Sequence, residues 1–282
     1  MRKDYDLIKK NFEDFISTWQ TKDINPLDKL IKKEVVAYLS IVKSEQDGSQ
    51  HSIFGIRDFV LDIPVTDHFD YTIGNYVCKM NEAKAQSAAE VQVVASNNDG
   101  KYFKFIATIT VSWTKEDNNW LAEEIRMDVQ PYSSPLMDEF AQVWHFEDNL
   151  AVLSGTVHLP CIFPEFDSPY NKITDAIDVL TEEEKVADCF YKFNYGVDWL
   201  VFRYVKETLA DDFKNDDKAH FINNTKFTRQ PYRYHSSAYR YKSIDVKKDK
   251  AVGVFESVVP DLVTKTVEFV KNDDKWQILS IN

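Results

Sequence analysis

A segment of eleven residues occurs twice in this chain, once near the middle and once close to the end. It reads "TVSWTKEDNNW" at residues 110–120 and "TVEFVKNDDKW" at residues 266–276. Thr, Val, Lys, Asp and Trp recur at the same five places, and the aromatic Trp113 is matched by Phe269. In both copies a polar run interrupts a strand-like alternation, which predicts a β-hairpin with its turn at the Lys, Asp and Asn residues.

Earlier segments repeat in the same order. "KAQSAAEVQVV" at 84–94 and "KAVGVFESVVP" at 250–260 share Lys, Ala, Glu and one Val, and both alternate as strands do. Further upstream, each half has apolar residues spaced 4, 3 and 4 apart, which predicts an amphipathic helix: Ile8, Phe12, Phe15 and Trp19, then Val186, Phe190, Phe193 and Val197. The offset between the copies falls from 178 to 166 to 156 residues, as expected for a tandem duplication with shorter loops in the second copy.

The helix of the second copy has a clear start, because Thr181 is followed three residues later by Glu184, which is the pattern of a capping box. A short second helix is expected to follow in each half. We therefore predict an α+β fold with two similar domains, residues 1–130 and 181–282, each with N-terminal helices packed on an antiparallel sheet. Residues 131–180 are rich in apolar and aromatic side chains, so we expect an ordered connector there.

The composition argues against several classes of function. With 46 acidic and 34 basic residues the formal net charge is −12, so neither nucleic acid nor a membrane surface is an expected partner. The seven glycines form no nucleotide-binding motif, and the histidines lack metal-ligand spacing, so no cofactor or metal is expected. Three widely spaced cysteines and the lack of a long apolar run predict a soluble, cytoplasmic protein.

The order of helix, short helix and strands, ending in T-V-x-aromatic-x-K-x-D-x-x-W, resembles the NTF2-like superfamily and especially its SnoaL-like branch. Residues 110–125 and 266–281 match best, and "GIRDFVLDI" at 55–63 resembles the third helix of such domains. The second copy has no obvious third helix. The resemblance implies two tandem cystatin-like cones, each with a curved sheet that wraps around helices to form a pocket. Because this fold serves dehydratases, isomerases, epoxide hydrolases and binding modules, the function stays open.

Alternation along residues 84–94 predicts which side chains face the helices. Odd-numbered residues from Ala85 to Val93 form the apolar side, and the equivalent side of the second copy carries Gly253 and other small residues. Small residues leave space under the helices, so a cavity is expected. The outer face of the second copy carries several valines, which suggests domain pairing or a homodimer through the outer sheet faces.

Three residues are candidates for acid-base catalysis. Glu123 alternates with Leu121 and Ile125, so we expect its carboxyl on an apolar face, where burial would raise its pKa. The alternative places Glu123 at the rim, in water. His68 and His235 both precede the strand that begins with the repeated Lys-Ala pair, and the resemblance implies a pocket histidine at that place. The alternative is a surface or structural histidine.

Tyrosines and arginines provide candidate ligand contacts in the second copy. Tyr191 and Tyr195 stand four residues apart on its first helix, where they either reach the pocket or belong to the core. Tyr239 and Arg240 belong to "QPYRYHSSAYRY", which could bind an aromatic or anionic ligand or could pack as an amphipathic strand pair.

Neither copy carries a full catalytic set. We therefore predict a non-catalytic small-molecule-binding or interaction protein, with a small hydrophobic or aromatic molecule as the expected ligand. The alternative is a cofactor-free SnoaL-like dehydratase or isomerase that acts on a small hydrophobic carbonyl compound by acid-base catalysis.

Overall fold

The structure is a computed structural model that describes residues 1–39, 41–42, 53–132, 145–146, 162–222, 238–257 and 262–282. It divides into two compact units, Met1–Thr72 with Cys78–Val179 and Ile73–Val77 with Leu180–Asn282. Each unit combines helices with a sheet, so the predicted α+β class is confirmed. The described part of the expected connector, residues 162–179, groups with the N-terminal unit, and the predicted domain boundaries stay predictions.

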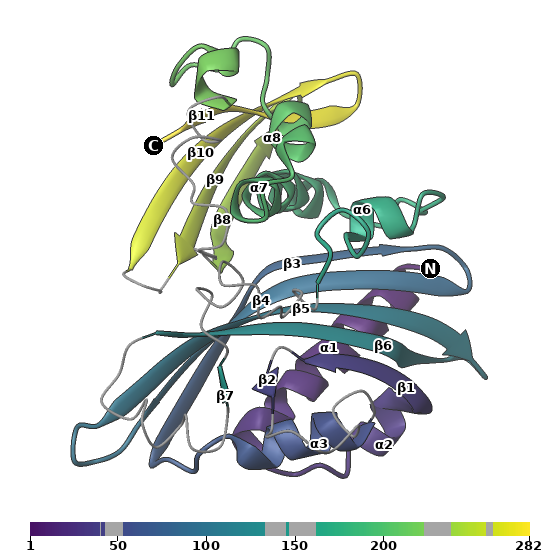
Figure 1. The fold of residues 1–282 in the computed structure, drawn as a ribbon. Coiled ribbons are helices and arrows are strands. Elements are labelled where there is room, and N and C mark those ends of the chain that lie inside the picture. Colours follow the sequence, from purple (N-terminus) through teal and green to yellow (C-terminus); the bar gives the residue numbers. More distant parts are fainter. Residues whose placement is uncertain (40, 43–52, 133–144, 147–161, 223–237, 258–261) are drawn as a thin grey trace, which may run out of the picture. The chain divides into compact units, whose positions relative to one another are not determined.

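The N-terminal unit packs helices on a five-stranded sheet. Its helices are α1 (Arg2–Thr21), α2 (Leu27–Leu30), α3 (Ile53–Asp62) and α6 (Pro169–Lys172). The sheet has the order β1-β6-β5-β4-β3, with β1 (Ile31–Leu39), β3 (His68–Met80), β4 (Lys84–Ser96), β5 (Tyr102–Glu116) and β6 (Asn119–Tyr132). β1 pairs with β6 in parallel, β4–β5 and β5–β6 are antiparallel, and the short β2 (Ile41–Val42) and β7 (His145–Phe146) pair with each other. Figure 1 shows α1, α2 and α3 on one face of the sheet and α6 on the other.

The predicted apolar face of α1 forms the core between helices and sheet. Phe12 and Trp19 are fully buried, and the Trp19 ring lies 5.1 Å from that of Phe59 in α3 and 6.0 Å from that of Phe105 in β5. Burial of each such side chain contributes about 1.5–3 kcal/mol. The helix predicted at 55–63 is confirmed as α3. Large aromatic side chains therefore fill the inner side of this sheet around Trp19.

The C-terminal unit packs helices on a four-stranded antiparallel sheet. These include α7 (Glu182–Asp198) and α8 (Phe202–Thr208). The strands are β8 (Tyr239–Lys247), β9 (Lys250–Ser257), β10 (Val263–Asn272) and β11 (Lys275–Ile281), in the order β11-β10-β9-β8. The predicted capping box is confirmed, since Thr181 Oγ1 accepts from Glu184 N at 3.3 Å and Glu184 Oε2 accepts from Thr181 N at 2.8 Å.

Aromatic rings occupy the inner side of this second sheet as well. The Phe255 ring is fully buried, and its centroid lies 4.0 Å from that of Phe190 in α7. A Cβ added to Gly253 would lie 2.5 Å from Phe255 Cε2 and 3.3 Å from Phe269 Cε2. The small residue thus makes room for neighbouring rings, and the space expected at Gly253 is filled by them. Sequence alternation alone could not reveal that the ring of Phe255 folds back over the glycine.

One set of contacts joins the first helix of the N-terminal unit to its last hairpin. Asp4, in the first turn of α1, accepts a hydrogen bond from Trp120 Nε1 at 3.0 Å and pairs with Lys115 Nζ at 2.7 Å. Further along α1, Asn11 Nδ2 donates to the backbone oxygen of Trp120 at 2.9 Å. The hydrogen bond from Lys115, followed by that from Trp120, holds the pKa of the Asp4 carboxyl well below its usual value.

The C-terminal unit has the same contacts at the repeat offsets of 178 and 156 residues. Glu182, in the first turn of α7, accepts from Trp276 Nε1 at 3.1 Å and pairs with Lys271 Nζ at 3.0 Å. Cys189 Sγ donates to the backbone oxygen of Trp276 at 3.1 Å, where Asn11 donates in the first unit. Hydrogen bonds from Lys271 and Lys185 lower the pKa of Glu182 to about 2. An acid at the helix start and a Lys and Trp in the hairpin therefore fasten each helix to its sheet.

The two predicted hairpins are confirmed, and they share a left-handed turn and a shift in strand register. Their turns use left-handed backbone at consecutive residues, Asp117 and Asn118 in one and Asp273 and Asp274 in the other. This geometry matches the twist of a two-residue hairpin. The strand register also shifts at equivalent places, between Ser112 and Trp113 and between Glu268 and Phe269. None of the helices in the described ranges is both long and apolar enough to cross a membrane.

Candidate functional site

The outer face of the N-terminal sheet, opposite α1, is polar and largely buried. In an antiparallel sheet, residues directly opposite each other on neighbouring strands share a face. Three such rows cross β4, β5 and β6 on this face: Gln86, Ser112 and Glu124; Ala88, Thr110 and Arg126; and Glu90, Thr108 and Asp128. Alternation predicted the polar character of this side of β4, but Gln86 is only 1% exposed and Glu90 only 2%. Something other than water must therefore cover these side chains.

Part of the cover is a segment of the same chain, residues 162–172, which we call the docked segment. It begins with a turn in which Asp167 N donates to the Phe163 oxygen at 2.8 Å and Asp167 Oδ2 accepts from Phe163 N at 2.7 Å. It ends in α6, where Ser168 caps the helix through a hydrogen bond from Tyr170 N and Pro169 occupies the first turn. The aspartate carboxylate thus closes the turn and still has a second oxygen available.

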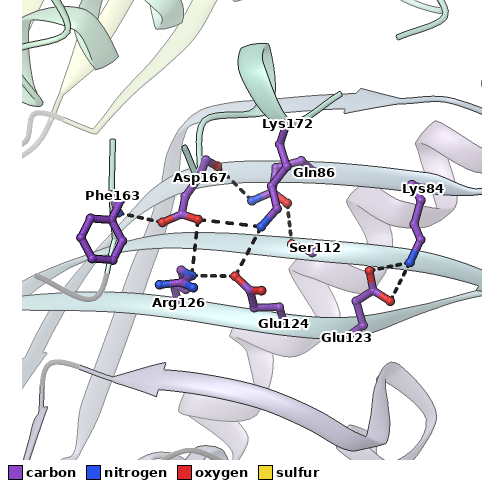
Figure 2. A network of polar contacts seen from close by, with 9 residues as sticks. All are labelled: Lys84, Gln86, Ser112, Glu123, Glu124, Arg126, Phe163, Asp167 and Lys172. Carbon is purple, nitrogen blue, oxygen red and sulfur yellow. Dashed lines mark hydrogen bonds and ion pairs between the residues drawn. The ribbon is translucent and has the colours of Figure 1, made fainter. Parts of the chain in front are cut away.

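Two acids and two bases hold the docked segment on the sheet (Figure 2). Arg126 Nε lies 2.6 Å from Glu124 Oε1 and 3.4 Å from Asp167 Oδ1. Lys172 Nζ pairs with both carboxylates as well, at 3.3 Å from the same Glu124 oxygen and 3.8 Å from the same Asp167 oxygen. Glu124 and Arg126 come from β6, whereas Asp167 and Lys172 come from the docked segment. The charges alternate in sign and sum to zero, so each carboxylate faces two cations.

The surroundings strengthen this charge network, which consists of Glu124, Arg126, Asp167 and Lys172. The Asp167 side chain is only 6% exposed, and the Arg126 guanidinium lies over the ring of Tyr38 at 4.3 Å. Burial acts to raise the pKa of Glu124, but the hydrogen bond from Arg126 and the charge of Lys172 outweigh it, and the pKa is lowered. The carboxylate of Glu124 is therefore held in its charged form.

The sheet also binds the backbone of the docked segment through neutral side chains and one carboxylate. Gln86 Nε2 donates to the backbone oxygen of Asp167 at 3.0 Å, and Gln86 Oε1 accepts from Ser112 Oγ at 2.7 Å. Asp128 Oδ2 accepts from the backbone N–H of Ile162 at 3.2 Å. This face thus offers an amide donor and a carboxylate acceptor to a polypeptide backbone. Among the described residues, no group of His, Cys, Asp and Glu has the arrangement of a metal site.

The structure places the predicted acid Glu123 differently from the sequence pattern. Ser112 pairs with Glu124 and Trp113 pairs with Ala122, so Glu123 is the extra residue of a β-bulge. The bulge shifts the alternation by one residue, and the Glu123 side chain is 30% exposed, with Lys84 Nζ at 2.7 Å. Figure 2 shows this pair apart from the charge network. The expectation of an apolar face for Glu123 was therefore wrong, and its catalytic role stays a prediction.

The predicted base does not lie near that acid. His68, at the start of β3, is exposed, and its Nε2 lies 3.2 Å from Asn98 Oδ1 just after the end of β4. Glu123 pairs instead with Lys84 at the beginning of β4. The thirteen residues of β4 separate the two ends by about 40 Å along the strand. The structure thus does not bring His68 and Glu123 together, and His235 lies outside the described residues.

The predicted ligand contacts of the C-terminal unit separate into different environments. Tyr191 is buried, its hydroxyl accepts from Tyr241 N at 3.2 Å, and burial strongly raises its pKa. The Tyr191 ring lies 6.1 Å from that of Phe255 and the Tyr239 ring 5.4 Å from that of Phe190, so both belong to the aromatic cluster around Phe190 and Phe255. Tyr195 instead contacts Trp199 and Tyr204, and Arg240 is exposed on β8. The structure therefore brings Tyr191 and Tyr239 into one cluster but leaves Tyr195 and Arg240 outside it.

Sequence reasoning missed the charge network. Arg126 and its partner Asp167 are 41 residues apart in the chain, so no local pattern joins them. A proline-bounded turn at "FPEFDSP" was the only local signal of an ordered segment. Nothing in that segment indicated which face of which sheet it would cover.

No family model matches the sequence, and no curated protein matches it. Among solved structures, the chain is similar to an NTF2-like protein with a cystatin-like fold from Novosphingobium aromaticivorans, at 10% identity and a TM-score of 0.37, over 49% of this chain and 88% of that chain. Hexachlorocyclohexane dehydrochlorinase LinA-type3 from Novosphingobium barchaimii has 11% identity and a TM-score of 0.37, and the match covers 46% of this chain and 87% of that chain. The association domain of C. elegans CaMKII has 13% identity and a TM-score of 0.35, and the match covers 43% of this chain and 91% of that chain. Each match spans less than half of this chain.

Proposed function

We propose that this chain is a non-catalytic interaction protein built from two tandem NTF2-like units. In this proposal the outer face of the N-terminal sheet is a docking platform for a polypeptide segment. One observation carries it: this face already binds residues 162–172 of its own chain, through the charge network and through contacts with their backbone. Buried polar side chains on a sheet face are costly unless they are paired, and a docked polypeptide supplies the partners.

The recurring contacts support the tandem arrangement. The acid at the helix start, the hairpin Lys and Trp, the left-handed turn and the register shift all recur at the offsets of the sequence repeat. A likeness this specific is expected of two copies of one ancestral unit, because each contact joins residues that are far apart in the chain. Homodimerisation through the outer sheet faces also remains a proposal.

Several observations favour interaction over catalysis. Aromatic side chains occupy the inner sides of both sheets around Trp19 and Phe255. The predicted acid and base of the N-terminal unit lie at opposite ends of β4. In the charge network each carboxylate is paired with two cations, which suits a structural lock better than proton transfer.

Binding of the docked segment as a separate peptide tests the proposal. We expect a fluorescent peptide of residues 162–172, "IFPEFDSPYNK", to bind the full chain carrying Asp167→Ala and not the wild-type chain. In the wild type the tethered segment outcompetes the peptide by its high effective concentration, and the substitution weakens that competitor. Fluorescence anisotropy measures the binding.

The matched control is the same peptide with alanine in place of its aspartate, which should bind at least tenfold more weakly, because it cannot pair with Arg126. A second control adds Arg126→Ala to the Asp167→Ala chain and should remove binding of the unaltered peptide. If neither peptide binds the Asp167→Ala chain, or if both bind equally, the docking platform is refuted.

A further inference from the structure

The docked segment divides into residues that are buried on the sheet and residues that face solvent. Ile162 at its start is fully buried, and so are the three consecutive residues 167–169. Between them, Glu165 and Phe166 are exposed, and Phe166 exposes 79% of its surface. Side chains that stay in water contribute little to the free energy of binding. The contacts that hold the segment therefore lie at the two ends of its turn and not at the tip.

The first end of the turn places an aromatic ring beside a cation of the sheet. The guanidinium of Arg126 lies 5.8 Å from the centroid of the Phe163 ring and 4.3 Å from that of the Tyr38 ring. A guanidinium within about 6 Å of a ring centroid is attracted to the face of that ring. Tyr38 and Arg126 belong to the sheet, in β1 and β6. An aromatic side chain at position 163 of the segment thus gains a contact that an aliphatic one lacks.

The second end of the turn is Asp167, which uses both carboxylate oxygens. Oδ2 accepts from the backbone N–H of Phe163, four residues earlier, at 2.7 Å. Oδ1 lies 3.4 Å from Arg126 Nε and 3.8 Å from Lys172 Nζ. An asparagine has one acceptor oxygen and no charge, so it cannot close the turn and also form the ion pairs. This place therefore requires a carboxylate, four residues after the aromatic residue.

Ser168 and Pro169 start a helix directly after that carboxylate. Ser168 Oγ accepts from Tyr170 N at 3.3 Å, which caps α6, and Pro169 occupies its first turn. Both residues are buried, and α6 lies against β4. A short capping side chain followed by proline thus turns the chain into the helix without leaving a buried N–H unpaired.

We propose that the docking platform binds segments of other proteins in which an aliphatic and an aromatic residue are followed by three residues of the turn and then by Asp-Ser-Pro. This inference rests on the proposed docking function and adds the chemistry of the partner. The hydrogen bonds of Gln86 and Asp128 involve only the backbone of the segment, so they add affinity for any sequence. A partner segment of this pattern makes the same contacts as residues 162–172 and displaces them.

Single substitutions in the fluorescent peptide of residues 162–172 test this pattern, with anisotropy measured against the Asp167→Ala chain. We expect Phe163→Ala in the peptide to weaken binding about threefold to fivefold, because the contact with the guanidinium is lost. Ser168→Ala should weaken it about fivefold through loss of the helix cap. Asp167→Asn should weaken it about tenfold or more, because the charge that pairs with Arg126 is lost.

Phe166→Ala is the matched control for Phe163→Ala, because it removes the same side chain from the exposed tip of the turn. This peptide, and one that also carries Glu165→Ala, should bind within about twofold of the unaltered peptide. If the unaltered peptide binds but Phe166→Ala weakens it as much as Phe163→Ala, or Asp167→Asn has no effect, the docking platform stands and the proposed pattern is overturned. Failure of the unaltered peptide to bind overturns both.

Discussion

Replacing Phe255 with alanine is expected to destabilise the C-terminal unit by about 3–5 kcal/mol. The ring is fully buried and fills the space over Gly253. Its centroid lies 4.0 Å from that of the Phe190 ring and 6.3 Å from that of the Phe269 ring. Its removal leaves a cavity between α7 and the sheet, which the small residues of β9 cannot close. Hydrogen exchange of β9 and β10 measures the loss as faster opening of those strands.

Val252→Ala is the matched control for that variant. Val252 precedes Gly253 in β9, points to the opposite face and is 44% exposed. We expect its substitution to change the free energy of opening by no more than about 0.5 kcal/mol. Equal effects of the two substitutions would contradict an inner face that is packed by aromatic rings.

Replacing Asp167 with alanine is expected to weaken the attachment of the docked segment by about 2–3 kcal/mol. The change removes the acceptor of Phe163 N at 2.7 Å and the ion pairs with Arg126 and Lys172. Arg126 keeps Glu124 at 2.6 Å, so the loss stays below that of an isolated buried charge. The free energy of opening of residues 162–172, read from hydrogen exchange, measures the effect.

Asp175→Ala provides the control for that variant. Asp175 is exposed, and its carboxylate accepts from Asn81 Nδ2 at 3.1 Å. Removing this contact should change the opening of residues 162–172 by no more than about 0.5 kcal/mol. If Asp167→Ala also stays within that limit, the charge network does not hold the segment.

Features set by local spacing could be predicted from the sequence. Helical and strand periodicity, together with turn chemistry, predicted three features, and all three are confirmed. They are the apolar face of α1, the capping box of Thr181 and Glu184, and the two polar hairpin turns. The division of β4 into an inner apolar and an outer polar side is confirmed for the same reason.

Features that depend on contacts between distant residues could not be predicted. The bulge at Glu123 reflects how β5 and β6 pair, and no residue in the strand marks it, so alternation alone places Glu123 on the wrong face. The partnership of Arg126 with Asp167 likewise has no local signature.

A double-mutant cycle between Arg126 and Asp167 tests the docking platform most directly. The free energy of opening of residues 162–172 is measured by hydrogen exchange in the wild type, Arg126→Ala, Asp167→Ala and the double variant. The two side chains approach to 3.4 Å in a nearly buried setting, so we predict a coupling energy of about 1–2 kcal/mol. Effects that add within about 0.5 kcal/mol would mean that the contact between Arg126 and Asp167 does not hold the segment, which would contradict the central contact of the docking platform.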